Sequence, residues 1–317
     1  MSRSLRGDCC GRPNGNLRRK VPGCFGAIAA DNPGSRGRKT VPGGRGGLGR
    51  EAWEEMITAG IDVGHKYTKV VVWDGERVLA RHCRLTGFEQ KEAAEAALAA
   101  ALGDAGVPRE RVAAVVATGA GKSEVWFADS RITEVGADAR GALCLVPGAR
   151  TVVDVGAEEG RAIRLDAGGR VVDFAMNEKC AAGTGSFTES MARALGVGVD
   201  EMGPLSLKST RLVPMNAQCA VFAESEVVSL IHARTAREDI ARAVNDAMAG
   251  RIAAQTRRVG VEKEVVLAGG VARNAGFVKA LEEDLELKVV IPEAPEYVTA
   301  LGAACVARER AGGKGNG

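Results

Sequence analysis

Two copies of one tripeptide, Asp62-Val63-Gly64 and Asp154-Val155-Gly156, could do phosphate chemistry. Each is expected at the end of a strand that turns tightly into the next strand. Such a turn brings backbone N–H groups and a carboxylate to one point, where phosphate oxygens and a hydrated metal ion can be held. A single Asp-x-Gly is more often only a turn. Two copies in matched positions are stronger evidence for a binding site than one.

Cys180 and Cys219 are the second candidate for chemistry, because each lies three residues after an Asn and directly before an Ala. Predicted helices follow both, and their N-terminal dipoles would favour thiolate at a shared centre. A [4Fe–4S] cluster takes four thiolates, whereas only these two cysteines stand in matched contexts, so one chain would supply half of a site. The alternative from the residues alone is a pair of small buried hydrophobes.

The segment Gly119-Ala120-Gly121-Lys122-Ser123 is similar to the end of a P-loop, but the first glycine of that motif would fall on Val116. We therefore predict only a tight turn there, after a strand at residues 112–117. The three histidines, His65, His82 and His232, show no metal-ligand spacing.

The elements that must position these residues form two similar halves. Strands are predicted at residues 57–63, 67–73 and 76–83, followed by a helix at 89–105 and the strand at 112–117. A second set follows at 151–155, 161–166 and 170–176. Helices are predicted at 185–195, 224–231, 237–259, 276–285 and 298–310, with a buried strand at 264–267. Because the Asp-Val-Gly turn recurs at the same place in both sets, we infer a structural duplication.

Composition limits the class of protein. The chain has 317 residues, of which 45% are hydrophobic and 26% charged, enough for one large or two medium domains. The net charge of +3 comes from a Gly- and Arg-rich stretch at residues 1–55 without periodicity, so it is poor evidence for nucleic-acid binding. We expect that stretch to be disordered, either upstream of a true start at Met56 or as a basic arm. Eight cysteines without a signal peptide or a long apolar run predict reduced thiols, no membrane association and a cytoplasmic location.

The two turns, with the strand that runs into Gly269-Gly270-Val271, resemble the phosphate and adenosine loops of the actin/Hsp70/sugar kinase superfamily. That resemblance implies an α/β, duplicated, ribonuclease H-like ATPase fold with two domains around a nucleotide cleft, at residues 57–148 and 149–310, and a disordered tail at 311–317. It implies a catalytic set that would bind Mg²⁺ and orient the attacking water: Asp62, Asp154 and Glu158. The residues it implies for ATP binding are Gly64, Lys66, Thr68, Gly156, Gly269, Gly270 and Asn274.

Residues 177–187, 205–210, 216–226 and 267–274 are similar to the BadF/BadG/BcrA/BcrD-type ATPase family, over roughly residues 57–310. This family contains activators of 2-hydroxyacyl-CoA dehydratases and ATPase subunits of benzoyl-CoA reductase. The resemblance implies that Cys180 and Cys219 bind a [4Fe–4S] cluster at a dimer interface with an identical or related subunit. It also implies a low-potential electron donor such as ferredoxin, and an acyl-CoA-reducing or dehydrating partner. ATP hydrolysis would drive the electron transfer.

Within that family the segment Ala157-Glu158-Glu159-Gly160 is closer to an ATPase subunit of benzoyl-CoA reductase, whereas dehydratase activators usually carry Gly-Gly-Gln there. We therefore expect a benzoyl-CoA reductase subunit, with a dehydratase activator as the alternative. A sugar or carboxylate kinase of the same fold is a more distant alternative, as is an actin-like polymer or chaperone-type module. Neither explains the paired Asn-x-x-Cys-Ala segments.

Overall fold

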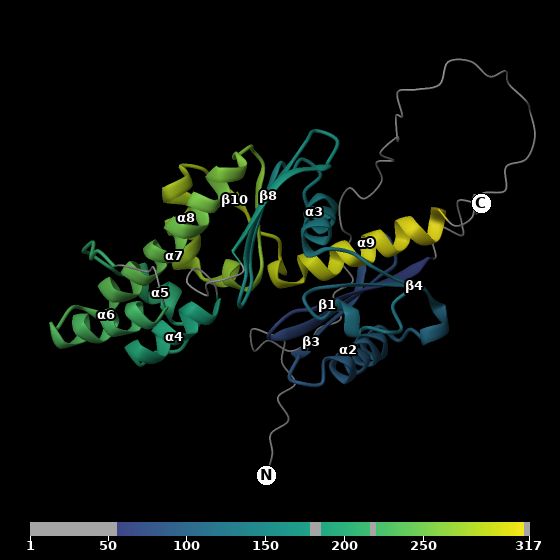
Figure 1. Ribbon diagram of the computed structural model, residues 1–317, viewed down its shortest axis with the longest axis horizontal. Helices are drawn as coiled ribbons and strands as arrows, with labels where there is room; N and C mark the ends of the chain where they lie inside the picture. Colours follow the sequence, from purple (N-terminus) through teal and green to yellow (C-terminus); the bar gives the residue numbers. More distant parts are fainter. Residues whose placement is uncertain (1–55, 178–184, 216–219, 314–317) are drawn as a thin grey trace, which may run out of the picture.

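The chain folds around two five-stranded sheets that share one topology (Figure 1). The structure, a computed structural model, describes residues 56–177, 185–215 and 220–313. The extension expected at residues 1–55, the last four residues, and both Cys180 and Cys219 lie outside these ranges.

Each sheet begins with three antiparallel strands and is completed by two parallel ones. The first sheet has the order β3-β2-β1-β4-β5 and the second the order β10-β9-β6-β7-β8, so the strands correspond pair by pair. The first set is β1 (Ile57–Val63), β2 (Tyr67–Trp73), β3 (Val78–Leu85), β4 (Val112–Thr118) and β5 (Ser130–Arg131). The second set is β6 (Thr151–Val155), β7 (Gly160–Leu165), β8 (Val171–Asn177), β9 (Val265–Ala268) and β10 (Val289–Val290). The predicted duplication is confirmed.

Helices cover both faces of the sheets. The described α-helices are α2 (Gln90–Ala105), α3 (Glu134–Leu145), α4 (Gly185–Leu195), α5 (Met202–Ser206), α6 (Ala220–His232), α7 (Arg237–Val259), α8 (Ala275–Leu285) and α9 (Val298–Gly313). Alanines of α2 pack against Ile61 and Val70 of the first sheet, and α9 covers its other face. On the second sheet, α7 packs on one side and α3 on the other, through Ala139 against Ile163.

The helices α3 and α9 pack against each other between the two sheets (Figure 1). Glycines permit this approach: a Cβ at Gly302 would lie 1.8 Å from the Ala137 carbonyl oxygen, and a Cβ at Gly141 would lie 2.0 Å from that of Val298. The two halves are therefore joined through backbone-to-backbone contact. Although α9 is the last described helix, it packs on β1 and β4 of the first sheet. The domain division after residue 148 stays a proposal.

The structure corrects three expectations. The helix α3 and the short elements α5, β5 and β10 are not predicted, and α9 continues to Gly313, into the expected tail. Reduced thiols are expected throughout, whereas Cys83 and Cys144 are disulfide-bonded and pack in one core cluster. Sequence spacing does not show which cysteines a fold buries in the same core. Cys305 is free and buried. None of the described helices has the length and apolar character needed to cross a bilayer.

Candidate functional site

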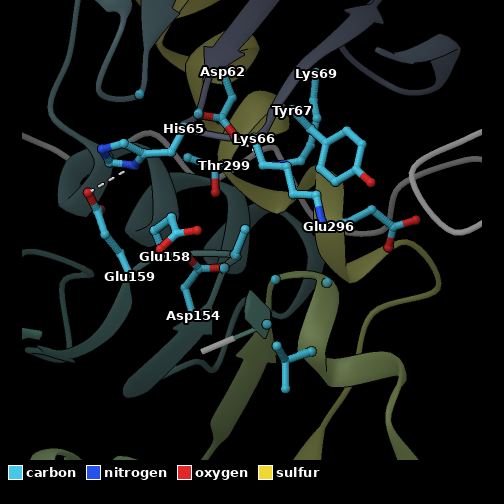
Figure 2. Close-up of a pocket in the computed structure, with 18 of the residues that line it drawn as sticks. Asp62, His65, Lys66, Tyr67, Lys69, Asp154, Glu158, Glu159, Glu296 and Thr299 are labelled. Atoms are coloured by element: carbon cyan, nitrogen blue, oxygen red, sulfur yellow. Dashed lines mark hydrogen bonds and ion pairs between the residues drawn. The ribbon is translucent and has the colours of Figure 1, made fainter. Parts of the chain in front are cut away.

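A cavity of about 610 Å³ lies between the two sheets. The first strand of each sheet ends in it, so Asp62 of β1 and Asp154 of β6 enter from opposite sides (Figure 2). Nine of the ten residues predicted to be catalytic or nucleotide-binding line this cavity: Asp62, Gly64, Lys66, Asp154, Gly156, Glu158, Gly269, Gly270 and Asn274.

The turn after each of these two strands has the same hydrogen bond. The Gly64 amide donates to the Tyr67 carbonyl at 3.1 Å, and the Gly156 amide donates to the Glu159 carbonyl at 2.8 Å. The two Asp-Val-Gly segments therefore build matched tight turns, as their spacing predicts. Backbone N–H groups in such turns can bind phosphate oxygens.

Each aspartate is paired with a cation seven residues later, on the neighbouring antiparallel strand. Asp62 stands opposite Lys69, whose Nζ donates to Oδ2 at 3.0 Å. Asp154 stands opposite Arg161, whose Nη2 donates to Oδ2. Burial alone would lower the pKa of Lys69, but the charge and hydrogen bond of Asp62 outweigh burial and raise it. Each of the two aspartate side chains is therefore fixed in direction by a neighbouring cation.

A glycine behind each aspartate completes the duplication. Gly119 follows β4 and Gly269 follows β9, with φ of 92° and 85°, a region that side chains other than glycine avoid. A Cβ at Gly119 would lie 2.7 Å from Asp62 Oδ1, and a Cβ at Gly269 would lie 2.7 Å from Asp154 Oδ1. The segment that resembles a P-loop is therefore the tight turn predicted there, and Gly119 is the counterpart of Gly269.

Arg161 connects the second turn to the helices between the sheets. Its Nε donates to Asp138 of α3 at 2.8 Å and its Nη1 donates to Glu159 at 2.9 Å, in addition to its bond with Asp154. The Thr299 hydroxyl of α9 donates to the other oxygen of Asp138 at 2.7 Å. Burial raises the pKa of Asp138 to about 7, against the opposing effect of Arg161. Burial also acts to lower the pKa of Arg161, but its carboxylate neighbours outweigh burial and raise it.

Three predicted residues have local partners. Thr68 lies outside the cavity, buried with its hydroxyl 3.0 Å from that of Thr86, because successive residues of β2 face opposite sides. Its neighbours Tyr67 and Lys69 line the cavity instead. The Ser186 hydroxyl donates to Glu158 at 2.5 Å. The Asn274 side chain caps α8, accepting from the Gly276 and Phe277 amides at 3.0 and 3.1 Å.

The lining carries more negative than positive charge. Among its described residues are four cations, Lys66, Lys69, Arg161 and Arg273, and eight carboxylates, Asp62, Glu134, Asp154, Glu158, Glu159, Glu189, Asp200 and Glu296. A polyphosphate therefore needs an accompanying divalent cation to bind here. Within the part of the chain that the structure describes, no group of three or more His, Cys, Asp or Glu side chains could hold a metal directly. Mg²⁺ suits this arrangement, since it usually keeps waters and is held by one or two carboxylates and by substrate phosphates.

The sequence interpretation omits Lys69, Arg161, Gly119 and Asp138. A basic residue seven positions after each Asp-Val-Gly aspartate is the signal that could have found the first two. Asp138 lies on α3, a helix that is not predicted from the sequence, so no comparable sequence signal points to Asp138.

Comparison with known proteins agrees with this geometry. A model of the BadF/BadG/BcrA/BcrD ATPase family matches residues 59–307. The activator of lactoyl-CoA dehydratase from Anaerotignum propionicum is 41% identical over 257 residues, which cover 81% of this chain and 99% of that protein. A benzoyl-CoA reductase subunit from Thauera aromatica is 36% identical over 260 residues, covering 78% and 92%.

Two solved structures bear on the fold. The activator of the 2-hydroxyisocaproyl-CoA dehydratase from Clostridium difficile, with bound ADPNP, has a TM-score of 0.77 and 36% identity, covering 82% of this chain and 97% of that one. A ROK family glucokinase from Streptomyces griseus, in complex with glucose and AMPPNP, has a TM-score of 0.53 at 15% identity, covering 80% and 99%, and supports the fold alone. The predicted actin/Hsp70/sugar kinase-like fold is confirmed. The chain belongs to the BadF/BadG/BcrA/BcrD ATPase family.

Proposed function

We propose that this chain is the ATP-hydrolysing activator of a 2-hydroxyacyl-CoA dehydratase, which drives a low-potential electron into the dehydratase component. The supporting observation is the matched pair of turns around one cavity, each with an aspartate and its cation. Benzoyl-CoA reductase, which residues 157–160 favour, has less support. The chain covers 99% of the lactoyl-CoA dehydratase activator at 41% identity, against 92% of the benzoyl-CoA reductase subunit at 36%.

In the proposed site the nucleoside end of ATP lies along Gly269 and Gly270, and the phosphates lie between the two turns. Gly64 and Gly156 supply backbone N–H groups from opposite sides. Lys69 and Arg161 hold the side chains of Asp62 and Asp154 fixed in direction by hydrogen bonds, so the site needs little reorganisation when the reaction begins. In-line phosphoryl transfer depends on such positioning more than on covalent chemistry.

Asp62 and Asp154 are the proposed holders of hydrated Mg²⁺, which when bound neutralises phosphate charge. Asp154 or Glu158 orients the attacking water. The Glu158 carboxylate accepts from Ser186 at the start of α4, which fixes one of its oxygens and leaves the other for a water. A carboxylate there can also accept the proton of that water.

The electron-transfer half of the proposal rests on the family resemblance. Cys180 and Cys219 are the proposed ligands of a [4Fe–4S] cluster shared with a second subunit, and both lie outside the described residues. A reduced ferredoxin is the proposed electron donor. The helices α4 and α6, which begin five and one residues after these cysteines, pack on each other through Phe187 and Val227, so a movement of α4 would reach both cysteine segments.

The test is reconstitution under anaerobic conditions. The full chain, reduced and supplied with MgATP, is added to purified dehydratase components for lactoyl-CoA and 2-hydroxyisocaproyl-CoA, and separately to a benzoyl-CoA reductase lacking its ATPase subunits. We expect formation of the unsaturated acyl-CoA in at least one dehydratase reaction, dependent on ATP. Activity only with the reductase would instead favour the benzoyl-CoA reductase assignment. Phosphorylation of a sugar, without any activation, would favour a kinase.

A further inference from the structure

Two consecutive residues of the first turn reach across the cavity to the second half of the molecule. His65 Nδ1 lies 3.4 Å from Glu159 Oε1, in the turn after β6 (Figure 2). Lys66 Nζ donates to both carboxylate oxygens of Glu189, on α4, at 2.5 Å. In the described structure these contacts therefore bridge the gap that the proposed phosphate chain would enter.

The Lys66–Glu189 pair differs from the other ion pairs of the lining. Lys69 and Arg273 pair with carboxylate side chains that are 9% and 2% exposed, and the three carboxylate partners of Arg161 are 0%, 5% and 20% exposed, whereas Glu189 is 34% exposed. Losing a cation from a buried carboxylate is costly, but an exposed carboxylate is resolvated by water. Among the four described lining cations, Lys66 is therefore the one that can leave its partner most readily for a ligand.

We infer that Glu189 couples the binding of a nucleoside triphosphate to α4, because it competes with the terminal phosphate for Lys66 and loses this cation only when a triphosphate is bound. This inference rests on the proposed function. Lys66 extends from the first turn to α4 of the second half, across the cavity that the proposed terminal phosphate would enter. A diphosphate ends short of the gap and leaves the Lys66–Glu189 pair in place.

The exchange has a mechanical consequence for α4. When Lys66 turns to the phosphate, Glu189 loses its cation and faces an anion. The start of α4 is fixed to the second turn, since the Gly185 and Ser186 amides donate to Gly156 and Ala157 carbonyls at 2.9 Å. Repulsion between Glu189 and the phosphate therefore acts on a helix that is anchored at one end. Its buried residues Phe187 and Met191 transmit the force to α6.

The test is nucleotide affinity, measured by calorimetry with Mg²⁺ for ADP and for a non-hydrolysable ATP analogue, on the full chain. Removing the competing carboxylate in Glu189→Gln should strengthen binding of the analogue about tenfold, which is the contribution of one contact to a charged group. The affinity for ADP should stay almost unchanged. Lys66→Met should weaken the analogue about tenfold with little effect on ADP. When Lys66→Met is already present, adding Glu189→Gln should change the affinity for the analogue by less than it does in the wild type. Glu92→Gln, exposed on α2 and outside the lining, is the matched control and should change neither affinity.

The possible outcomes distinguish a failure of the role given to Glu189 from a failure of the proposed function. Equal effects on both nucleotides, or no change of the affinity ratio in either single variant, would overturn the role of Glu189 while leaving ATP binding intact. A wild-type chain that binds neither nucleotide would overturn the proposed function together with this inference.

Discussion

Replacing Arg161 by Met should destabilise the protein strongly and in a pH-dependent way. The Arg161 side chain is 9% exposed and donates to Asp138, Asp154 and Glu159, of which the first two are 0% and 5% exposed. Removing one partner of a buried ion pair costs about 3–5 kcal/mol, because the remaining charge is left uncompensated. At about 2–4 °C per kcal/mol for a chain of this size, the melting temperature should fall by about 6–20 °C.

The pH dependence distinguishes lost charge from lost packing. Arg161 opposes the effect of burial on Asp138, so the pKa of this carboxyl rises further in the folded variant. A carboxyl whose pKa is higher in the folded than in the unfolded state favours folding more as the pH falls. The gap between variant and wild type should therefore narrow from pH 8 to pH 6.

The assay is thermal unfolding by circular dichroism over that pH range, with Arg161→Lys as the control that keeps the charge. Because one ammonium cannot reproduce a guanidinium fork toward three carboxylates, this variant should lie between wild type and Arg161→Met. A loss in Arg161→Met that is the same at pH 8 and pH 6, or a fall of less than about 2 °C, would refute the account of Arg161 as the neutralising centre.

Three further predictions concern other links in the structure. Gly302→Ala places a methyl group 1.8 Å from a backbone oxygen of α3 and should lower the free energy of unfolding by about 1–3 kcal/mol. The control Gly103→Ala, in open space on α2, should be neutral or stabilising. Similar effects of the two substitutions in denaturant titration would contradict the close packing of α3 and α9. Burial raises the pKa of Asp138 in the folded chain to about 7. The free energy of unfolding of the wild type should therefore decline by up to about 1.4 kcal/mol per pH unit as the pH rises from the ordinary pKa of an aspartate toward 7. Asp138→Asn should lack this component when unfolding is followed against pH. Anaerobically purified protein should contain about four irons per dimer, the content of a single [4Fe–4S] cluster, and lose them in both Cys180→Ala and Cys219→Ala; full iron in either variant would exclude that ligand.

The sequence shows most of the fold because its strongest signals are local. Alternating and buried apolar runs mark β1, β2, β6 and β9 within a residue of their observed bounds. The repeated Asp-Val-Gly turns then reveal the duplication. By contrast α3 escapes prediction, since Gly136 and Gly141 lower the helix propensity of its short sequence.

The candidate site is only partly readable from the sequence, because several of its contacts depend on register and on long-range packing. Thr68 is one position out of register from Lys69, a difference that the alternation of a strand decides and residue types do not. Asp138 meets Arg161 across 23 residues, and Lys66 meets Glu189 across 123 residues. Only the folded arrangement of the two sheets with α3 and α4 brings these groups together.

The most direct test of the account is electron transfer itself. Reduced protein is mixed anaerobically with an oxidised dehydratase component in a stopped-flow instrument, and its reoxidation is followed by absorbance with MgATP, with MgADP and without nucleotide. The account predicts fast transfer with MgATP only, and its loss in Asp154→Asn, which keeps the size of the side chain but not its charge. Transfer at the same rate without nucleotide, or undiminished in Asp154→Asn, would contradict the claim that ATP between the two turns drives the electron.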